Sequence, residues 1–285
     1  LVSLCLSHNP LDNYGAITIA GGLASCNVLT FLTLSNCEIG DAGVAALVRA
    51  LPQALLELDL SSNAITALGL AHVATSLRFL QTPSLTHLNF SGNEVGPGGG
   101  AELAEALPVG TPQLERLDLR GCFLADPGVT WLSPALPLCK KLRVLHLGSN
   151  GVGDAGAAAL AAVLPGCLRL KQLSLAMNSI TGDGAWALAE EMVHEGSSLI
   201  SLDMRGNVLG DDGASAIADI IAEVPTLEFI DLSNNDIEDE GGIAFAESLE
   251  DGRVAGLTII MESNRGIIGS VRSRLEAAVA SCATV

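Results

Sequence analysis

Aromatic residues and lysines are scarce in this chain. Only 3% of its residues are aromatic although 49% are hydrophobic, so its core has to be built from aliphatic side chains. The lysines are Lys140, Lys141 and Lys171, and 32 acidic residues face 14 lysines and arginines, which gives a net charge of −18. A nucleic-acid-binding protein needs a basic face that neutralises phosphates, and an anionic membrane surface repels an acidic chain. The composition therefore argues against both kinds of partner.

The sequence also lacks targeting and metal-binding signals. No run of about 20 apolar residues is present, which argues against membrane insertion. The chain opens on Leu1 without a basic stretch, so no signal peptide is visible, and its abrupt start inside a repeat predicts further sequence upstream. The seven cysteines form no CxxC pair and no histidine lies at zinc-ligand spacing, so we expect neither a metal nor a cofactor. Reduced, buried thiols favour a cytoplasmic location, with a cytoskeletal or ciliary assembly as one possible setting.

An internal repeat is the main feature of the sequence. The pattern LxxLxLxxNxL recurs from end to end, with 26 to 30 residues between successive copies. Its nine regular copies start at Leu1, Leu29, Leu55, Leu85, Leu114, Leu142, Leu170, Leu199 and Leu227. A degenerate tenth copy follows near Gly256 to Gly266. Such a period indicates a solenoid in which each unit packs on its neighbours.

The first half of each repeat predicts a short strand and a bend. With the first Leu as offset 0, offsets 0, 3 and 5 are apolar, and the last two share one face of a strand. Offset 8 is asparagine in seven copies, and Cys37 and Cys122 replace it in two. A buried amide has to satisfy its donors and acceptors, so we expect these side chains to bond neighbouring backbones and form a ladder. Cysteine can occupy the same position as a small, weak donor.

The second half predicts a helix. Offset 12 is most often aspartate, which suits an N-cap or a first helical turn because a carboxylate accepts from free N–H groups there. Offset 14 is glycine in all nine regular copies, which predicts a close backbone approach. Offsets 18 and 22 are always apolar, and a spacing of four marks one helical face.

These features predict an α/β leucine-rich-repeat solenoid of about ten repeats. Strands lie about 4.8 Å apart whereas packed helices need about 8–10 Å, so the stack should bend into a horseshoe with the parallel sheet on its concave face and helices on its convex face. We expect a single domain over residues 1–285, with nine regular repeats in 1–255 and a degenerate repeat with a capping helix in 256–285. In that last helix, Val271, Leu275 and Val279 form the apolar stripe.

Segments such as LELDLSSNAITALGL and LRVLHLGSNGVGDAGAAALAAVL resemble the ribonuclease-inhibitor-like class of leucine-rich repeats. The resemblance covers essentially the whole chain and implies the horseshoe fold. It leaves function open, because the class includes ribonuclease inhibitor, sensor domains of NOD-like receptors, Ran GTPase-activating proteins and ciliary scaffold subunits.

Offsets 2, 4 and 6 should point from the strands into the concave hollow. There they would form a mixed polar strip with exposed aromatic residues, in which aromatic and arginine side chains are the usual anchors for a protein partner. The candidate partner-binding residues are Phe31, Glu57, Asp59, Arg116, Asp118, Arg120, His146, Asp203, Arg205, Phe229 and Asp231. The alternative interpretation is a solvated sheet surface without a partner.

Other candidates for a site are weaker. Asp203 and Asp231 lie on adjacent expected strands and could share a proton or a cation, but Arg205 and water are expected to screen them. Trp186 is expected on the outside of a helix, either exposed to a partner or covered by a neighbour. We therefore expect no catalytic residue and no metal ligand.

The sequence favours a non-enzymatic scaffold or adaptor that binds a protein through the concave sheet face, with a place as a subunit of a larger assembly as one setting. One alternative is a GTPase activator similar to the Ran-activating family, although no arginine stands at the matching loop position and the chain ends in SCATV instead of an acidic tail. Another is the sensing domain of a NOD-like receptor, which requires a nucleotide-binding domain upstream.

Overall fold

The computed structural model describes residues 1–80, 84–194, 196–250 and 256–282. The chain divides into two compact units, Leu1–Asn150 and Gly151–Val285, and the same strand-and-helix repeat builds both. Whether the two units behave as the single domain expected from the repeats stays a prediction.

Ten short strands lie in the described residues, one in each repeat. Each of the first nine begins two residues after the first leucine of its repeat, as the pattern predicts. The strands are β1 (Ser3–Cys5), β2 (Phe31–Thr33), β3 (Glu57–Asp59), β4 (His87–Asn89), β5 (Arg116–Asp118), β6 (Val144–His146), β7 (Gln172–Ser174), β8 (Ser201–Asp203), β9 (Phe229–Asp231) and β10 (Thr258–Ile260).

A helix follows every described strand. The α-helices are α1 (Asp12–Leu23), α2 (Asp41–Arg49), α3 (Ala67–Leu80), α4 (Gly96–Gly110), α5 (Ala125–Leu132), α6 (Asp154–Ala161), α7 (Gly182–Met192), α8 (Gly210–Ile220), α9 (Asp239–Glu250) and α10 (Gly269–Cys282). Two 3₁₀ helices are also present. One is η1 (Ser133–Leu138), which continues α5, and the other is η2 (Leu164–Gly166), which follows α6.

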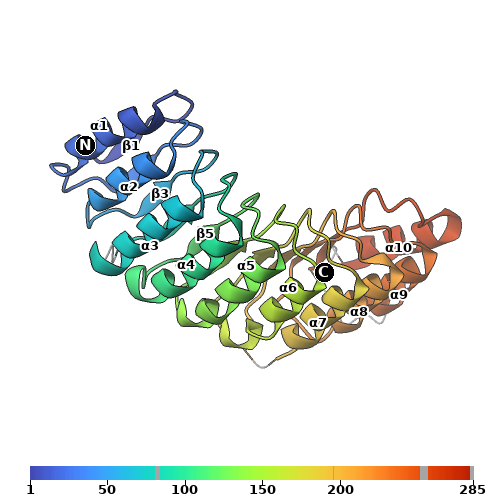
Figure 1. The fold of residues 1–285 in the computed structure, drawn as a ribbon. Coiled ribbons are helices and arrows are strands. Elements are labelled where there is room, and N and C mark those ends of the chain that lie inside the picture. Colours follow the sequence, from blue (N-terminus) through green and yellow to red (C-terminus); the bar gives the residue numbers. More distant parts are fainter. Residues whose placement is uncertain (81–83, 195, 251–255, 283–285) are drawn as a thin grey trace. The chain divides into compact units, whose positions relative to one another are not determined.

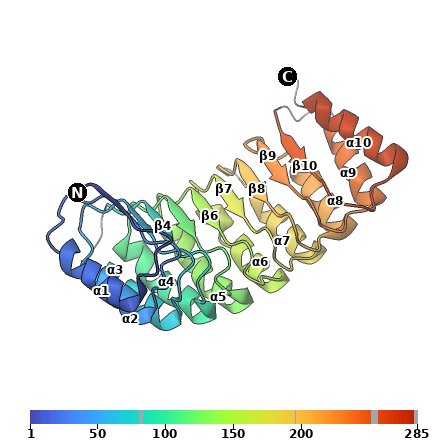
Figure 2. The ribbon, with the colours of Figure 1, turned by 90° about the horizontal axis from the view of Figure 1, so that it is seen from above.

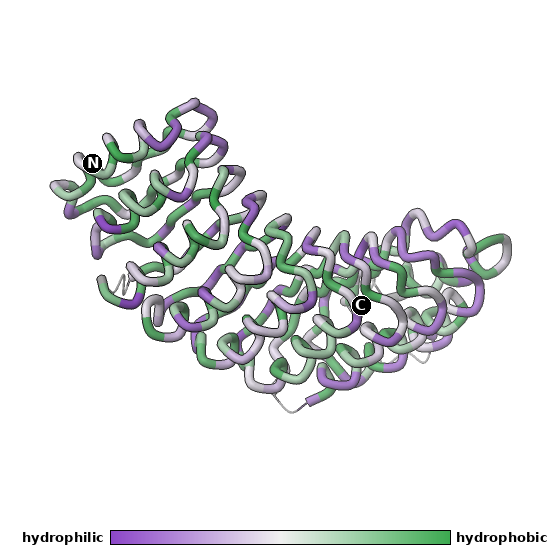
Figure 3. Tube along the Cα trace, in the orientation of Figure 1, coloured by the Kyte–Doolittle hydropathy of each residue, from purple (hydrophilic) through white to green (hydrophobic). Residues whose placement is uncertain are grey.

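The strands pair in parallel with their sequence neighbours. In the first unit the order is β1-β2-β3-β4-β5-β6, and in the second it is β7-β8-β9-β10. The register joins equal offsets, for example Leu58 with Leu88 and Asp59 with Asn89. Within each unit the helices lie on one side of the strands (Figures 1 and 2), and hydrophobic residues recur in every repeat (Figure 3). This alternation of parallel strands and helices confirms the predicted solenoid class.

The asparagine ladder is present as predicted. Asn63 Oδ1 accepts the backbone N–H groups of Cys37 and Ile39 in the preceding repeat, each at 3.0 Å. Its Nδ2 donates to Leu34 O at 2.8 Å and to Leu60 O at 3.0 Å. These bonds satisfy a polar group at the bend and join consecutive repeats, which is what a buried amide requires.

Cysteine takes part in the same ladder where it replaces asparagine. Cys37 Sγ donates to Leu6 O at 3.2 Å, and Cys122 Sγ donates to Phe90 O at 3.2 Å. Burial raises the pKa of the Cys122 thiol to about 12. A thiol held protonated in this way is a structural donor and a poor nucleophile.

The aspartates at offset 12 correct the sequence interpretation in one respect, because their carboxylates cap the helix of the following repeat. Asp154 Oδ1 accepts the backbone N–H groups of Thr181 and Gly184, and its Oδ2 accepts the Thr181 hydroxyl. Asp211 does the same for Glu238 and Gly241. The acceptor reaches the positive end of the neighbouring helix dipole, so the charge ties two repeats together.

The glycine at offset 14 of each regular repeat is explained by this cap. A Cβ on Gly184 would collide with the Asp154 carboxylate and with Ile180 of its own repeat, and a Cβ on Gly241 would lie only 2.8 Å from Asp211 Oδ1. Glycine at offset 14 therefore makes room for the carboxylate of the preceding repeat, in agreement with the predicted close approach.

Some helices end earlier than the pattern predicts. Offsets 14 to 22 were expected to be helical throughout, but α2 ends at Arg49 and α6 ends at Ala161, two and three residues short. In the fifth repeat α5 gives way at Ser133 to the 3₁₀ helix η1, which contains Pro134 and Pro137. Proline lacks the N–H that an α-helix interior requires, so it favours a tighter last turn there.

The last repeat keeps more of the pattern than its sequence suggests. Asn264 extends the ladder by accepting from Asn235 N at 2.8 Å. In α10, Leu275 is buried together with Ala278, whereas Val271 and Val279 are half-buried. Arg274 makes a paired hydrogen bond to Glu250 of α9, at 2.8 and 2.6 Å. Residues 251–255, at the end of the ninth repeat, and residues 283–285 of the expected terminal segment lie outside the described part of the chain.

Candidate functional site

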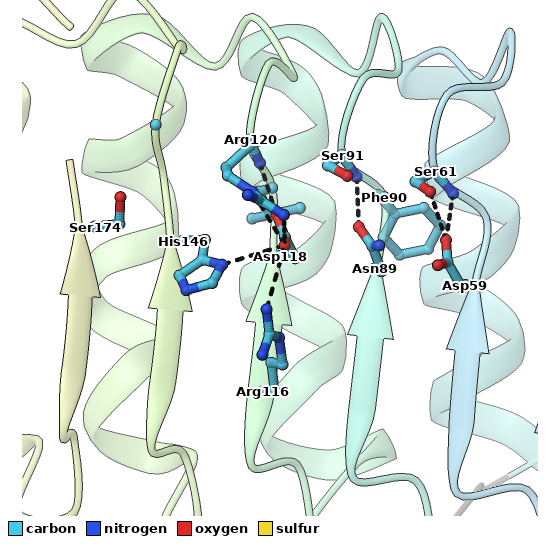
Figure 4. A network of polar contacts seen from close by, with 12 residues as sticks. Asp59, Ser61, Asn89, Phe90, Ser91, Arg116, Asp118, Arg120, His146 and Ser174 are labelled. Atoms are coloured by element: carbon cyan, nitrogen blue, oxygen red, sulfur yellow. Dashed lines mark hydrogen bonds and ion pairs between the residues drawn. The ribbon is translucent and has the colours of Figure 1, made fainter. Parts of the chain in front are cut away.

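The sheet face of the first unit carries a cluster of ion pairs centred on Asp118. Its carboxylate is only 3% exposed and accepts from Arg120 Nη2 at 2.6 Å and Arg120 Nε at 2.9 Å. His146 Nδ1 on β6 lies 3.2 Å from Asp118 Oδ2, and Arg116 Nη2 lies 4.0 Å from it. Figure 4 shows these side chains converging on Asp118 from β5 and β6. The structure therefore brings together four of the predicted residues.

The electrostatics of this cluster favour the ionised carboxylate. Burial raises the pKa of Asp118, but hydrogen bonds from His146 and Arg120 outweigh it and lower the pKa from 3.8 to about 2. The hydrogen bond to Asp118 raises the pKa of Arg120. Asp118 is thus a fixed negative charge that orients two guanidinium groups, since hydrogen bonds to an ionised group are the stronger ones.

The aspartates at offset 4 share a structural role that the sequence interpretation missed. Each accepts the backbone N–H of the residue two positions later, as in Asp59 with Ser61 at 2.9 Å and Asp231 with Ser233 at 2.9 Å. Asn89 does the same for Ser91 (Figure 4). Asp and Asn are favoured where a side chain caps the turn that ends a strand. Their recurrence at one offset is the signal that could have revealed this role.

An open depression on the sheet face links the Asp118 cluster to the neighbouring strands. It is lined by Glu57 and Asp59 of β3, His87 and Asn89 of β4, and by Arg116, Asp118 and Arg120. Phe31 pairs in register with Glu57 and is 40% exposed. The predicted residues of the first unit thus lie on β2 to β6, and His87 adds a residue outside the predicted set.

A second cluster lies on the sheet face of the other unit. Arg205 is within 3.7 Å of both Asp203 and Asp231, so a guanidinium separates the two carboxylates. Ser174 donates to Asp203 at 3.0 Å, and Phe229 stands beside Ser201 in register. In the described residues, no group of three or more His, Cys, Asp or Glu side chains is arranged to hold a metal ion.

Large apolar side chains are also exposed away from the strands. Trp186 on α7 is 59% exposed, so the interpretation that a neighbour covers it is wrong. Phe123, in the loop between β5 and α5, is 64% exposed and has a positive φ of 57°. Sequence reasoning did not single out Phe123, because its backbone conformation is not visible in the repeat pattern.

The comparison with known families agrees with this geometry. A family model described as leucine-rich repeat matches residues 25–48, 53–74, 81–104, 138–161, 167–189, 197–218 and 225–246, together more than half of the chain. The chain belongs to the leucine-rich-repeat family. Its similarity to a ribonuclease inhibitor confirms the ribonuclease-inhibitor-like class.

The ribonuclease inhibitor of Sus scrofa is 35% identical over 153 residues, which cover 53% of this chain and 33% of that protein. The human NACHT, LRR and PYD domains-containing protein 14 is 34% identical over 153 residues, which cover 53% of this chain and 14% of that protein. The chain therefore matches a third or less of the length of these relatives.

Among solved structures, internalin C2 from Listeria monocytogenes has a TM-score of 0.50 and 23% identity, covering 79% of this chain and 84% of that one. This likeness supports the fold. Among the helices of the described residues, none has the length and apolarity needed to cross a membrane.

Proposed function

We propose that this chain is a non-enzymatic scaffold that binds a partner protein through the sheet faces of its two units. The observation that carries the proposal is the preformed cluster of Arg116, Asp118, Arg120 and His146 in an open, polar depression. Arginine side chains held in place by a buried carboxylate lose little freedom on binding, and arginine is enriched in the residues that dominate protein interfaces.

The roles of the predicted residues differ under this proposal. Arg116, Arg120, Arg205 and the exposed Phe31 are contact residues, because their side chains reach solvent. Asp118 and Asp231 are buried and act by orienting the arginines beside them. Glu57, Asp59, His146, Asp203 and Phe229 contribute the partly exposed rim of the two clusters.

The relatives support binding as a function without naming the partner. The ribonuclease inhibitor is by its name a protein that acts on ribonucleases, and a similar binding role here is part of the proposal. The match to the NACHT, LRR and PYD domains-containing protein favours the sensing-domain alternative, in which the same sheet faces recognise the partner of a longer protein. The cytoplasmic location stays a prediction.

The test is the affinity of a partner isolated from native extract and then purified. Arg116→Glu should weaken its binding at least tenfold, which is about 1.4 kcal/mol. Arg116 is the suitable position on this cluster, because reversing Arg120 would leave the buried Asp118 without its closest counter-charge. Arg49→Glu, at the exposed end of helix α2, changes the net charge equally and should leave the affinity unchanged. Equal affinities of wild type and Arg116→Glu would contradict binding through this face.

A further inference from the structure

The loop between β5 and α5 has an unusual backbone. In every repeat, offset 7 adopts a positive φ, as in Asn36 at 53° and Gly92 at 71°. The fifth repeat has three such residues, Gly121 at 62°, Phe123 at 57° and Ala125 at 49°, and no other loop of the described residues has as many. Left-handed backbone is uncommon outside glycine, and a bulky residue in it is an outlier.

Phe123 gains nothing for the fold from this conformation. Its side chain is 64% exposed, so it adds little to the core. Other repeats place more tolerant residues at the same offset with positive φ, namely Glu38, Gly151 and Asp236. Strained positions persist where the surroundings hold them, and they gather at binding sites. An aromatic ring displayed on strained backbone therefore indicates a contact residue.

The loop that carries Phe123 begins directly after the Asp118 cluster. Phe123 follows Arg120 by three residues, so their Cα atoms are at most about 10 Å apart. Arg116 is 42% exposed and has Asp118, at 4.0 Å, as its ion-pair partner, while Arg120 is 52% exposed. Inside the cluster, two guanidinium groups around one buried carboxylate leave an excess of one positive charge, and the acidic residues of the same depression, Glu57 and Asp59, lie two strands away on β3. That excess stands out in a chain whose net charge is −18.

We propose that Phe123, Arg116 and Arg120 bind an acidic segment of the partner protein that carries a large apolar side chain next to its carboxylates. The apolar side chain packs on the Phe123 ring, and the carboxylates accept hydrogen bonds from the two guanidinium groups. This inference rests on the proposed function and names the chemistry of the partner at one place on it.

The probe is a phage-displayed library of random 12-residue peptides, selected on the full chain. The enriched peptides should combine Asp or Glu with Leu, Phe or Trp. An enriched peptide is then synthesised with a fluorescent label, and its Kd is measured by fluorescence polarisation. Phe123→Gly and Arg116→Gln should each raise the Kd at least tenfold.

Glycine at position 123 separates binding from stability. Because it removes the ring and relieves the positive φ, Phe123→Gly should unfold at the same or a higher midpoint while binding the peptide less tightly. Glu38→Gly is the matched control, since it relieves the same backbone conformation three repeats away and should leave the Kd unchanged.

Three results would overturn the inference: basic enriched peptides, an empty selection, or a Kd that neither Phe123→Gly nor Arg116→Gln changes. The proposed function has its own readout, because the native partner is a whole protein tested with Arg116→Glu. If Arg116→Glu loses the native partner but the peptide selection fails, the proposal of an acidic segment is refuted. The proposal that the chain is a scaffold is not.

Discussion

Asp118 combines two tasks in one side chain. Its carboxylate accepts the Arg120 backbone N–H at 3.2 Å, as the other offset-4 carboxylates do, and it also holds the Arg120 guanidinium. An aspartate that ends a strand can therefore position an arginine at no further structural cost. The same combination recurs at Asp203 and Arg205, where the ion pair is longer, at 3.7 Å.

The lowered pKa of Asp118 predicts how stability depends on pH. Because the pKa is about 2 in the folded chain and 3.8 ordinarily, the folded state favours the ionised form. The ionised carboxylate should contribute about 2 kcal/mol at pH values above 3.8, and this contribution should be lost as the pH falls through 2. Urea unfolding of wild type and Asp118→Asn between pH 6 and 2 measures it, and the difference between the two should shrink below pH 4.

Glu57→Gln serves as the control for that experiment, since it changes the net charge by the same amount outside the Asp118 ion pairs. A difference between wild type and Asp118→Asn that stays constant from pH 6 to 2 would show that the carboxylate is not stabilised by its partners.

At the scale of the helix and strand, the contacts that matter most join one repeat to the next. The amide of Asn63 bonds the backbone of the second repeat, and the carboxylate of Asp154 caps the helix of the seventh. Since each repeat supplies the acceptor for its neighbour, stability depends on the interfaces between repeats as much as on each repeat.

Asp154→Ala should destabilise the second unit by about 1–2 kcal/mol, as the loss of a helix cap does. The Gly184 amide, which donates to Asp154 Oδ1 at 3.0 Å, should exchange its hydrogen faster. Asp183→Ala removes an exposed acidic residue from the first turn of the same helix and should cost less than half as much. If Asp154→Ala and Asp183→Ala lower the free energy of unfolding in urea by the same amount, the negative charge near the helix start is what stabilises α7. The hydrogen bonds from the preceding repeat then add nothing.

The sequence predicts the strands and the ladder well, because each repeat offset that encodes them has one physical role in every copy. The apolar columns place the strands correctly, and the asparagine column places the ladder, because burial and hydrogen bonding act on every copy alike. The direction of the Asp154 cap could not be predicted, since the spacing fits an N-cap of its own helix equally well. Phe123 could not be predicted either, because what distinguishes it is a positive φ in the loop between β5 and α5. The repeat pattern describes what the loops share and not the backbone angle of one of them.

At the scale of the whole molecule, both units present an arginine–aspartate cluster on the sheet face, while exposed tryptophans lie on the helices. Arg120 with Asp118 marks the first unit, and Arg205 with Asp231 marks the second. Trp131 on α5 is 50% exposed and Trp186 on α7 is 59% exposed. The central claim is that the partner covers the strands and leaves these tryptophans open to solvent.

Hydroxyl-radical footprinting of the full chain, with and without its purified native partner, tests this claim most directly. Both faces carry side chains that the radical oxidises readily, so one experiment reads them together. We expect Phe31 and His87 on the sheet face of the first unit to become protected from oxidation, while Trp131 and Trp186 are oxidised as in the free chain. Protection of the two tryptophans with unchanged oxidation of Phe31 and His87 would contradict it.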